Sequence, residues 1–460
     1  MDDRPLIFRP LPLPPPPKPR CSHFASRGAC KHGERCKFAH DAAGDSCEEQ
    51  ARVRAEENPR ARRSQFFWLY KMPRDATEYQ LLVDTLAAHG FRRAENDAER
   101  QQAVLLWSGS AKAPSPIPPL CAVNRLGLGK GGGTWLTHKD RLASSLRQGR
   151  QSAVAPLTFT LPHERPALRR HCDEQRGAQA IWIVKLARNG RSRGTFVTRN
   201  VESISEKGEC VVCEYIQRPL LVQGHKHDLR LYVVVFPSTP VRAFMYSGGY
   251  VRFAAKEFSL ADIEEGGTWD PFVHLTYLDS IDRRQHRIQR EKEWTVQQLF
   301  EYLGEHPDCG PERAAGLWRD IKELAGRTVS CLPQALLQRS KDSRQDATSQ
   351  CRQDNTAPTA FELFGFDVLV DAELRPWLLE VNGQPHLGSS SKNGAFVFAS
   401  EHVEKAGVIA GTLSMALAGQ VADLDQVAAD VGFEPLHMLD FVGEDSWARA
   451  GAAPEHACLN

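Results

Sequence analysis

The sequence contains no apolar run close to the ~18 residues that a membrane-spanning helix needs, and it does not begin with the pattern of a secretory signal. We therefore expect neither membrane insertion nor secretion. Nor do the 12 cysteines form a dense disulfide framework, because they are scattered along 460 residues. They are better explained as thiols and metal ligands, and the expected location is the cytoplasm, with the nucleus as an alternative.

The sequence also lacks an excess of charge of either sign. The net charge is +1, from 58 basic and 57 acidic residues, so any basic surface for a polyanionic partner must be local. The content of 41% hydrophobic and 25% charged residues is typical of a globular protein with a substantial core. At ~150 residues per domain, the length predicts about three units.

The first 64 residues contain little material for a hydrophobic core. Residues 1–20 form a Pro-rich tail, which is expected to be extended, and residues 41–64 are expected to form a linker with some helix. Between them, residues 21–40 carry three cysteines and a histidine in the spacing C-x8-C-x5-C-x3-H. Three thiolates and an imidazole can complete a tetrahedral zinc shell, without which so short a segment could hardly fold. The predicted zinc ligands are Cys21, Cys30, Cys36 and His40.

This spacing resembles that of the CCCH zinc finger family. The resemblance implies binding of single-stranded RNA, with Phe24 and Phe38 as stacking platforms inside a locally basic patch. The alternative is a zinc module that mediates protein contacts or only caps the chain.

The stretch with the strongest pattern covers residues 361–382, FELFGFDVLVDAELRPWLLEVN. Two apolar runs of strand length flank a turn-like segment, which predicts an antiparallel hairpin. The hairpin would bring Asp367, Glu380 and Asn382 together, with the last two on one face of their strand. Three oxygen-bearing side chains of this kind suit magnesium, which completes its shell with water and phosphate oxygens. The alternative is that the acids are only the polar face of an edge hairpin.

The motifs FELFGFDVLVD and LRPWLLEVN resemble the signature of the tubulin tyrosine ligase-like family of ATP-grasp ligases. The resemblance implies an α+β, ATP-grasp-type fold over residues 65–420, in addition to the small zinc-stabilised finger. It also implies that Asp367, Glu380 and Asn382 hold magnesium and nucleotide phosphates. Within this range, residues 339–356 are polar and without periodicity and are predicted to be a disordered insertion, and residues 421–460 a loosely attached acidic tail.

Three further segments fit the resemblance in the family's order. An apolar strand ends on Lys185 and is followed by a glycine- and arginine-containing loop, which favours phosphate binding over a solvated hairpin tip. The strand at 211–216 leads into a connector that in the family holds adenine. The expected contacts are Glu214, Tyr215 and Ile216.

The third segment, KHDLRLYVVV at 226–235, places three charged side chains on one face of a predicted buried strand. The resemblance implies that Lys226 and Asp228 contact the nucleotide and that Arg230 faces the transferred phosphate or the acceptor carboxylate. Lys226 and Arg230 are the candidate catalytic residues. A structural salt-bridge network is the alternative.

Two further features concern the glycine cluster and the positions at which the sequence departs from the family. The glycine cluster at 127–133 does not match a phosphate-binding P-loop and is expected to be a surface loop, and Lys139 beyond it corresponds to a lysine that the family places close to the phosphates. The sequence departs from the family at His227, where an aromatic residue is usual, at Ser247, where an arginine clamps a substrate carboxylate, and at Tyr277, where an asparagine is usual.

The resemblance implies an ATP-dependent ligase that uses magnesium and adds glutamate, glycine or tyrosine to an acidic protein tail, such as that of tubulin, through an acyl phosphate. Association with the cytoskeleton or a cilium would follow. The competing hypothesis is an inactive scaffold that binds ATP and uses the finger to bind RNA. Ser247 and Tyr277 favour the scaffold, and the ligase is favoured if Arg252 or a loop arginine occupies the space beside Ser247.

Overall fold

The computed structural model describes most of the chain from residue 65 to residue 439. The described residues are 65–72, 79–110, 114, 116–118, 121–126, 133–174, 180–187, 192, 194–205, 208–238, 241–261, 263, 269–276, 294–333, 359–388, 399–418 and 423–439. The predicted zinc ligands, the linker, the 339–356 insertion and Tyr277 lie outside these residues. None of the helices in the described part of the chain is long and apolar enough to cross a membrane.

The first unit is a five-stranded sheet in the order β14-β4-β3-β1-β2, whose pairings are parallel. Helix α3 covers one face because Leu82 and Leu86 pack with Phe67 and Leu105 of the sheet. The elements of this unit are β1 (Gln65–Tyr70), α3 (Gln80–Ala88), β2 (Phe91–Arg93), α4 (Asp97–Arg100), β3 (Ala103–Ser108), β4 (Ala122–Val123) and β14 (Thr359–Ala360).

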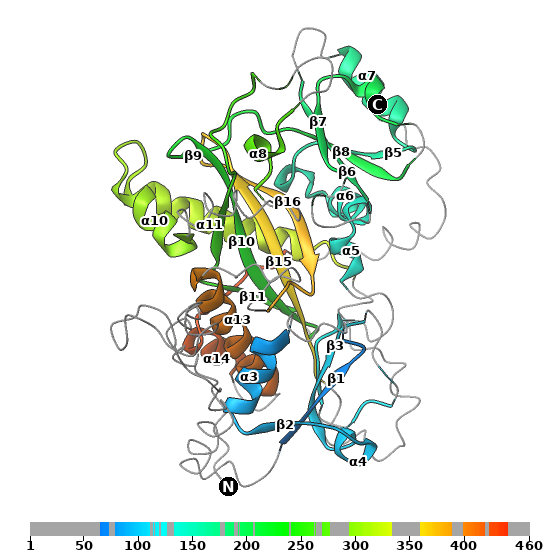
Figure 1. Cartoon of the computed structure of the whole chain (residues 1–460), viewed down its shortest axis with the longest axis vertical. Helices are drawn as coiled ribbons and strands as arrows, with labels where there is room; N and C mark the ends of the chain where they lie inside the picture. The colour runs from blue at the N-terminus through cyan, green and yellow to red at the C-terminus, as the bar shows by residue number, and fades with distance from the viewer. Residues whose placement is uncertain are drawn as a thin grey trace, which may run out of the picture.

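The second unit is an antiparallel sheet in the order β5-β8-β6-β7. Helix α7 packs on it through Leu168, which lies among Phe159, Trp182 and Val184. In Figure 1 this unit lies at the opposite end of the molecule from the first sheet. Its elements, with the helices that lead into it, are α5 (Thr134–Thr137), α6 (Lys139–Gln148), β5 (Thr158–Leu161), α7 (Arg165–Glu174), β6 (Trp182–Leu186), β7 (Phe196–Thr198) and β8 (Cys210–Glu214).

The third unit, between the other two, is an eight-stranded sheet built around β10. Strand β10 has β11, β12, β15 and β9 as antiparallel partners, and β15 pairs in turn with β16. The elements are β9 (Leu221–Val222), β10 (His225–Phe236), β11 (Arg242–Tyr246), β12 (Tyr250–Phe253), α8 (Pro271–His274), β13 (Trp294–Thr295), α10 (Val296–Glu305), α11 (Gly310–Val329), β15 (Glu362–Val370), β16 (Pro376–Gly383), α13 (Ala399–Ala418), α14 (Leu424–Asp430) and β17 (Phe433–Pro435).

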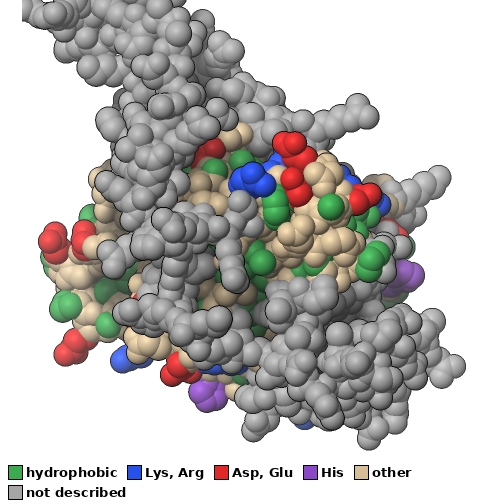
Figure 2. Space-filling model, turned by 90° about the horizontal axis from the view of Figure 1, so that it is seen from below, with side chains coloured by type: hydrophobic (Ala, Val, Ile, Leu, Met, Phe, Trp, Pro, Cys, Tyr) green, Lys and Arg blue, Asp and Glu red, His purple; other side chains and the backbone are tan. Residues whose placement is uncertain are grey.

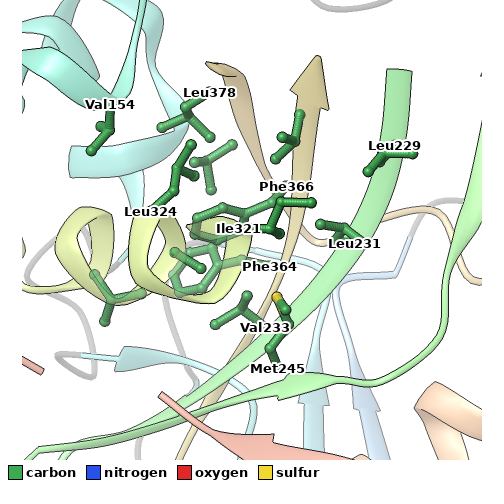
Figure 3. Close-up of a cluster of buried hydrophobic side chains, with 14 of the residues drawn as sticks. Val154, Leu229, Leu231, Val233, Met245, Ile321, Leu324, Phe364, Phe366 and Leu378 are labelled. Atoms are coloured by element: carbon green, nitrogen blue, oxygen red, sulfur yellow. The ribbon is translucent and has the colours of Figure 1, made fainter. Parts of the chain in front are cut away.

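Strand β10 is buried on both faces, which explains the unbroken run of apolar and aromatic residues in its second half, Leu231 to Phe236. Leu229, Leu231 and Val233 point to one face and pack with Ile321 and Leu324 of α11, as Figure 3 shows. The alternate residues, among them Tyr232 and Val234, belong to a second core that includes α13. Because side chains alternate along a strand, Lys226, Asp228 and Arg230 extend this second face beyond its apolar part. This architecture of mixed sheets and helices confirms the α+β prediction.

The predicted loose tail is wrong for residues 423–439. Strand β17 pairs with β11 and completes one edge of the large sheet. Phe433 is only 1% exposed, and Glu434 accepts hydrogen bonds from Trp318 Nε1 at 3.0 Å and Lys322 Nζ at 2.6 Å. This short strand could not be recognised in the acidic sequence around it. Its few apolar residues pack against α11, α13 and β11, which lie far away in the chain.

The described surface is mixed in charge. In the view of Figure 2, acidic, basic and hydrophobic side chains are interspersed over the part of that face that the structure describes. This agrees with the net charge of +1.

Candidate functional site

The predicted hairpin is confirmed by the antiparallel pairing of β15 with β16, in which Asp367 lies opposite Glu380. The pairing shifts register between Asp367 and Val368, and beyond this irregularity the strands run to a tight turn around Asp371. Asn382 Nδ2 donates hydrogen bonds to Asp367 Oδ2 at 3.2 Å and to Glu380 Oε1 at 3.3 Å. The three residues that the sequence singled out therefore contact one another.

Two arginines complete a buried network of alternating charge. Arg230 lies directly opposite Asp367 across β10 and β15, and Asp228 lies directly opposite Arg252 across β10 and β12. Arg230 binds Asp367 through Nε at 2.6 Å and Nη2 at 3.1 Å. Arg252 joins the two pairs, because its Nε is 2.6 Å from Asp228 Oδ1 and its Nη2 is 3.0 Å from Asp367 Oδ2.

This network fixes the charge of Asp367. Burial alone would raise the pKa of the carboxyl group, but the guanidinium groups of Arg230 and Arg252 outweigh it and hold the pKa well below its ordinary value. Asp367 is thus an anion at any physiological pH. The hypothesis of a structural salt-bridge network is correct in part, since Asp228 and Arg230 do form ion pairs.

Three lysines approach this network from different elements. Lys139, at the first position of α6, has its Nζ 3.4 Å from Glu380 Oε2. Its backbone N–H donates to Ala187 O, so the start of α6 lies at the end of the strand that carries Lys185. Lys185 is in turn close enough to Lys226 for its charge to lower the pKa of that residue. Lys139 therefore lies close to Lys185, which is in turn close to Lys226.

The segment at the end of β8, which the sequence predicted to contact adenine, also takes part in a buried cluster of hydrogen bonds. Glu214 is exposed, Ile216 is half-buried, and Tyr215 is buried with its hydroxyl in a polar contact. Lys226 Nζ donates to Tyr215 Oη at 2.9 Å and to the carbonyl of His274 at 3.0 Å, while Tyr215 Oη lies 2.8 Å from His274 Nδ1. Sequence analysis missed His274, although it is in the segment that was compared with the family at Tyr277.

The space near Ser247 is filled differently from the expectation. The Ser247 N–H donates to Gly432 O, and Gly249 N–H donates to Glu404 Oε2 at 2.8 Å. Arg252 is directed instead to Asp228 and Asp367. Among the described residues, the side chain that bonds to this turn is thus a carboxylate. Arg252 therefore does not meet the condition that would favour the ligase over the scaffold. The loop arginines lie outside the described residues.

Helix α13 adds a buried ion pair that the sequence did not reveal. Lys405 is 1% exposed, its Nζ lies 2.7 Å from Glu401 Oε1, and it donates to Gly388 O at 3.3 Å. It thereby attaches α13 to the segment that leaves the hairpin. The i,i+4 spacing was visible in the sequence, but on a surface helix the same spacing would indicate only a weak solvated pair.

A second carboxylate of β15 fixes the residues on both sides of the glycine cluster. Glu362 Oε2 accepts hydrogen bonds from Leu126 N at 3.2 Å and from Gly133 N at 3.0 Å. A Cβ at Gly133 would lie 2.5 Å from the Phe364 ring and 2.8 Å from Glu362 Oε1, so only glycine fits there. Residues 126 and 133 are therefore held against the strand that carries Asp367.

The donor set of the hairpin fits magnesium. The described part of the chain contains no group of three or more His, Cys, Asp or Glu side chains arranged around a metal. Magnesium, however, commonly takes one or two protein carboxylates and completes its shell with water and phosphate oxygens. Asp367, Glu380 and the amide of Asn382 supply side chains of this kind, and Lys139 adds a positive charge beside Glu380.

Comparisons with known proteins agree with this site. The model of the tubulin-tyrosine ligase family matches residues 131–400, more than half of the chain, and the C-x8-C-x5-C-x3-H zinc finger model matches residues 16–42. Similar proteins include a probable beta-tubulin polyglutamylase of Tetrahymena thermophila, 27% identical over 65% of this chain, and the human tubulin polyglutamylase TTLL7, 26% identical over 69%. A probable tubulin polyglutamylase of mouse, TTLL2, is 33% identical over 56%.

The matched regions span 25%, 35% and 45% of the lengths of these three relatives. The matches and the α+β architecture confirm the ATP-grasp-type fold expected from the sequence. The chain belongs to the tubulin-tyrosine ligase family and carries an N-terminal segment that matches a CCCH-type zinc finger.

Proposed function

We propose that the protein is an ATP-dependent ligase that joins an amino acid, with glutamate as the first candidate, to an acidic protein tail such as that of tubulin. The observation that carries this proposal is the pairing of Lys139 with Glu380 and of Arg230 with Asp367 on opposed positions of the hairpin. Lys226 lies beside Asp228, which is joined to the same network through Arg252. A cationic enclosure around two carboxylates suits a polyphosphate with its metal, and the relatives named as polyglutamylases favour glutamate. We also propose that the protein acts close to microtubules or in a cilium.

Each residue of the site has an assigned role in the proposal. Adenine lies against the connector of Glu214, Tyr215 and Ile216, and Lys185, Lys226 and Asp228 contact the nucleotide. Asp367, Glu380 and Asn382 would hold magnesium, which would neutralise negative charge on the phosphate oxygens. The lysines stabilise the charge that shifts to the leaving phosphate oxygen, and Arg230 orients the acceptor carboxylate or the transferred phosphoryl group.

The chemistry needs no protein nucleophile. A carboxylate oxygen of the acceptor attacks the γ-phosphorus of ATP, the bond to the β-γ bridging oxygen breaks, and ADP leaves. The amine of the incoming amino acid then attacks the acyl carbon, an amide forms, phosphate leaves, and the amine proton passes to solvent. The protein has mainly to position the acceptor carboxylate, the incoming amino acid and the phosphates of ATP. The buried arginines and lysines supply the positive charge for this.

Incorporation of labelled glutamate, glycine and tyrosine into purified tubulin, with ATP and magnesium, tests the proposal. The wild type should incorporate glutamate, and Glu380→Gln should lose it because the variant removes one carboxylate from the site. Glu434→Gln is the matched control, since Glu434 is hydrogen-bonded between α11 and β17 away from the site. Absence of incorporation by the wild type, with retained binding of ATP, would instead favour the scaffold.

We also propose that Cys21, Cys30, Cys36 and His40 bind zinc and that this finger binds single-stranded RNA. The support is the family match over residues 16–42 and the basic, aromatic composition of that segment. In Cys36→Ser the zinc content should fall by one equivalent per chain. The variant should also retain less of a fluorescent single-stranded RNA than the wild type does. RNA retention that does not change in this variant would contradict a role of the finger.

A further inference from the structure

Lys226 is buried in a site that holds its ammonium end in a fixed position. The residue is 6% exposed, and its Nζ lies 4.3 Å from the centroid of the Tyr215 ring. Two of its N–H groups are used in the bonds to Tyr215 Oη and the His274 carbonyl. An ammonium group has three donors, so one of them is not used by an acceptor among the described residues.

Tyr215 and His274 form a chain of hydrogen bonds behind this lysine. Because Tyr215 Oη accepts a hydrogen from Lys226, it can send its own hydrogen to His274 Nδ1, 2.8 Å away. We assign His274 the tautomer in which Nδ1 is unprotonated for this reason. The ring is 1% exposed and lies against the aromatic rings of Phe258 and Trp269, which prevent the imidazole from turning toward water.

The charges around Lys226 leave its protonation finely balanced. Burial lowers its pKa to about 7, Asp228 opposes this shift, and the nearby charge of Lys185 adds to it. Asp228 raises the pKa of Lys226 less than its proximity suggests, because its carboxylate already pairs with Arg252 and accepts a hydrogen bond from Thr276. The titratable groups facing Lys226 are therefore Tyr215 from the end of β8, His274 from α8, Asp228 from its own strand and Lys185 from β6.

We propose that Tyr215 and His274 are positioning residues that hold Lys226 for the nucleotide, and that nucleotide binding draws a proton onto Lys226. The inference rests on the proposed function, since it takes the site to bind a nucleotide polyphosphate. An anion beside Nζ favours the charged amine, so the complex contains a fully protonated Lys226. The protein alone contains a mixture of charged and neutral lysine near pH 7.

This linkage has measurable consequences. At pH 7 about half a proton should be taken up per nucleotide bound, rising toward one at pH 8 to 9. If the charged form alone binds, affinity should fall by up to about tenfold for each pH unit above 7. A lysine with an ordinary pKa would show neither effect in this range.

Isothermal titration of the full chain with ADP and magnesium, in buffers that differ in ionisation enthalpy, measures the protons taken up. Lys226→Arg is the matched control for protons released or bound by the ADP phosphates, since arginine stays charged. Because Lys226 is itself a proposed nucleotide contact, this variant should bind ADP more weakly, and the binding that it retains should lack the uptake assigned to Lys226. Uptake that is the same in the wild type and Lys226→Arg, or absent from both, would overturn the inference while ADP binding leaves the proposed function standing. Failure of the wild type to bind ADP would overturn both.

Two substitutions test the positioning role. Tyr215→Phe keeps the ring but removes the acceptor, so the midpoint of proton uptake should move down by about one pH unit and Kd at pH 7 should rise about fivefold. His274→Asn keeps an acceptor near the position of Nδ1 and should restore more of the wild-type profile than His274→Leu. Tyr302→Phe, on α10, is the remote control. Midpoints that are equal in the wild type and Tyr215→Phe would contradict the positioning role.

Discussion

Replacing His227 by phenylalanine should make the protein more resistant to acid. His227 lies on the face of β10 opposite to Lys226 and Asp228, where it is 1% exposed and packs against the Phe253 ring. Neither ring nitrogen has a hydrogen-bond partner of good geometry among the described residues, and the interaction with the backbone of His225 offsets only part of the effect of burial on the pKa. An unsatisfied buried polar group costs about 1–3 kcal/mol, so the variant should already be the more stable protein at pH 7.

The difference should grow as the pH falls. Burial lowers the pKa of His227 from 6.5 to about 4, so the unfolded chain binds a proton there before the folded protein does. The wild type therefore loses stability as the pH falls from about 6.5 to about 4. By linkage the loss is about 2 kcal/mol between pH 7 and pH 5, and His227→Phe lacks this part of the pH dependence.

Urea unfolding of the wild type and the variant at pH 7 and pH 5 measures this difference. For a slope of about 3 kcal/mol/M, the gap between the two midpoints should widen by about 0.7 M at pH 5. His306→Gln, a substitution at the end of α10, is the histidine control and should follow the wild type. A variant that is as acid-sensitive as the wild type, or less stable at pH 7, would refute the reasoning, because it would mean that the ring is hydrated or hydrogen-bonded.

The remaining predictions concern the charge network and the chain ends. Asp367→Asn should lower the free energy of unfolding by about 3–5 kcal/mol, because Arg230 and Arg252 lose their shared carboxylate; an unchanged urea midpoint would contradict this. Burial raises the pKa of Glu362 to about 6, so the wild type should lose about 2 kcal/mol as the pH rises from 4.5 through 6, and Glu362→Gln should lack that slope in the same titration. Truncation after residue 422 removes residues 423–460, including β17, and should expose the sheet edge, making the protein sensitive to limited proteolysis; full resistance would show that this segment is dispensable.

The hairpin could be predicted because its information is local. Alternation within each strand placed Glu380 and Asn382 on one face, and a turn of six residues left antiparallel pairing as the natural arrangement for Asp367. The departure at His227 was also visible in the sequence, but its meaning was not. Only the packing of Phe253 against it shows that a polar ring occupies an apolar place.

The partners of the predicted residues could not be derived in this way. Arg252 meets Asp367 from a strand 115 positions earlier, and Lys139 meets Glu380 from a helix that precedes it by 241 positions. Neither separation follows from the period of a helix or a strand, so the sequence pattern could not predict these contacts. The strand at 433–435 was hidden for the same reason, because three residues carry no periodic pattern and their partner is β11.

The sequence by itself determined the family resemblance, the zinc-ligand spacing, the hairpin and the list of charged residues that face the site. Each depends on residues close in the chain or on motifs in a fixed order. The tertiary structure decided which charges neutralise one another, which lysine is buried against Tyr215 and His274, and how the end of the chain completes the sheet. These depend on strand register and on burial, which arise only when segments far apart in the chain pack together, and burial sets the free energy of every charge among them.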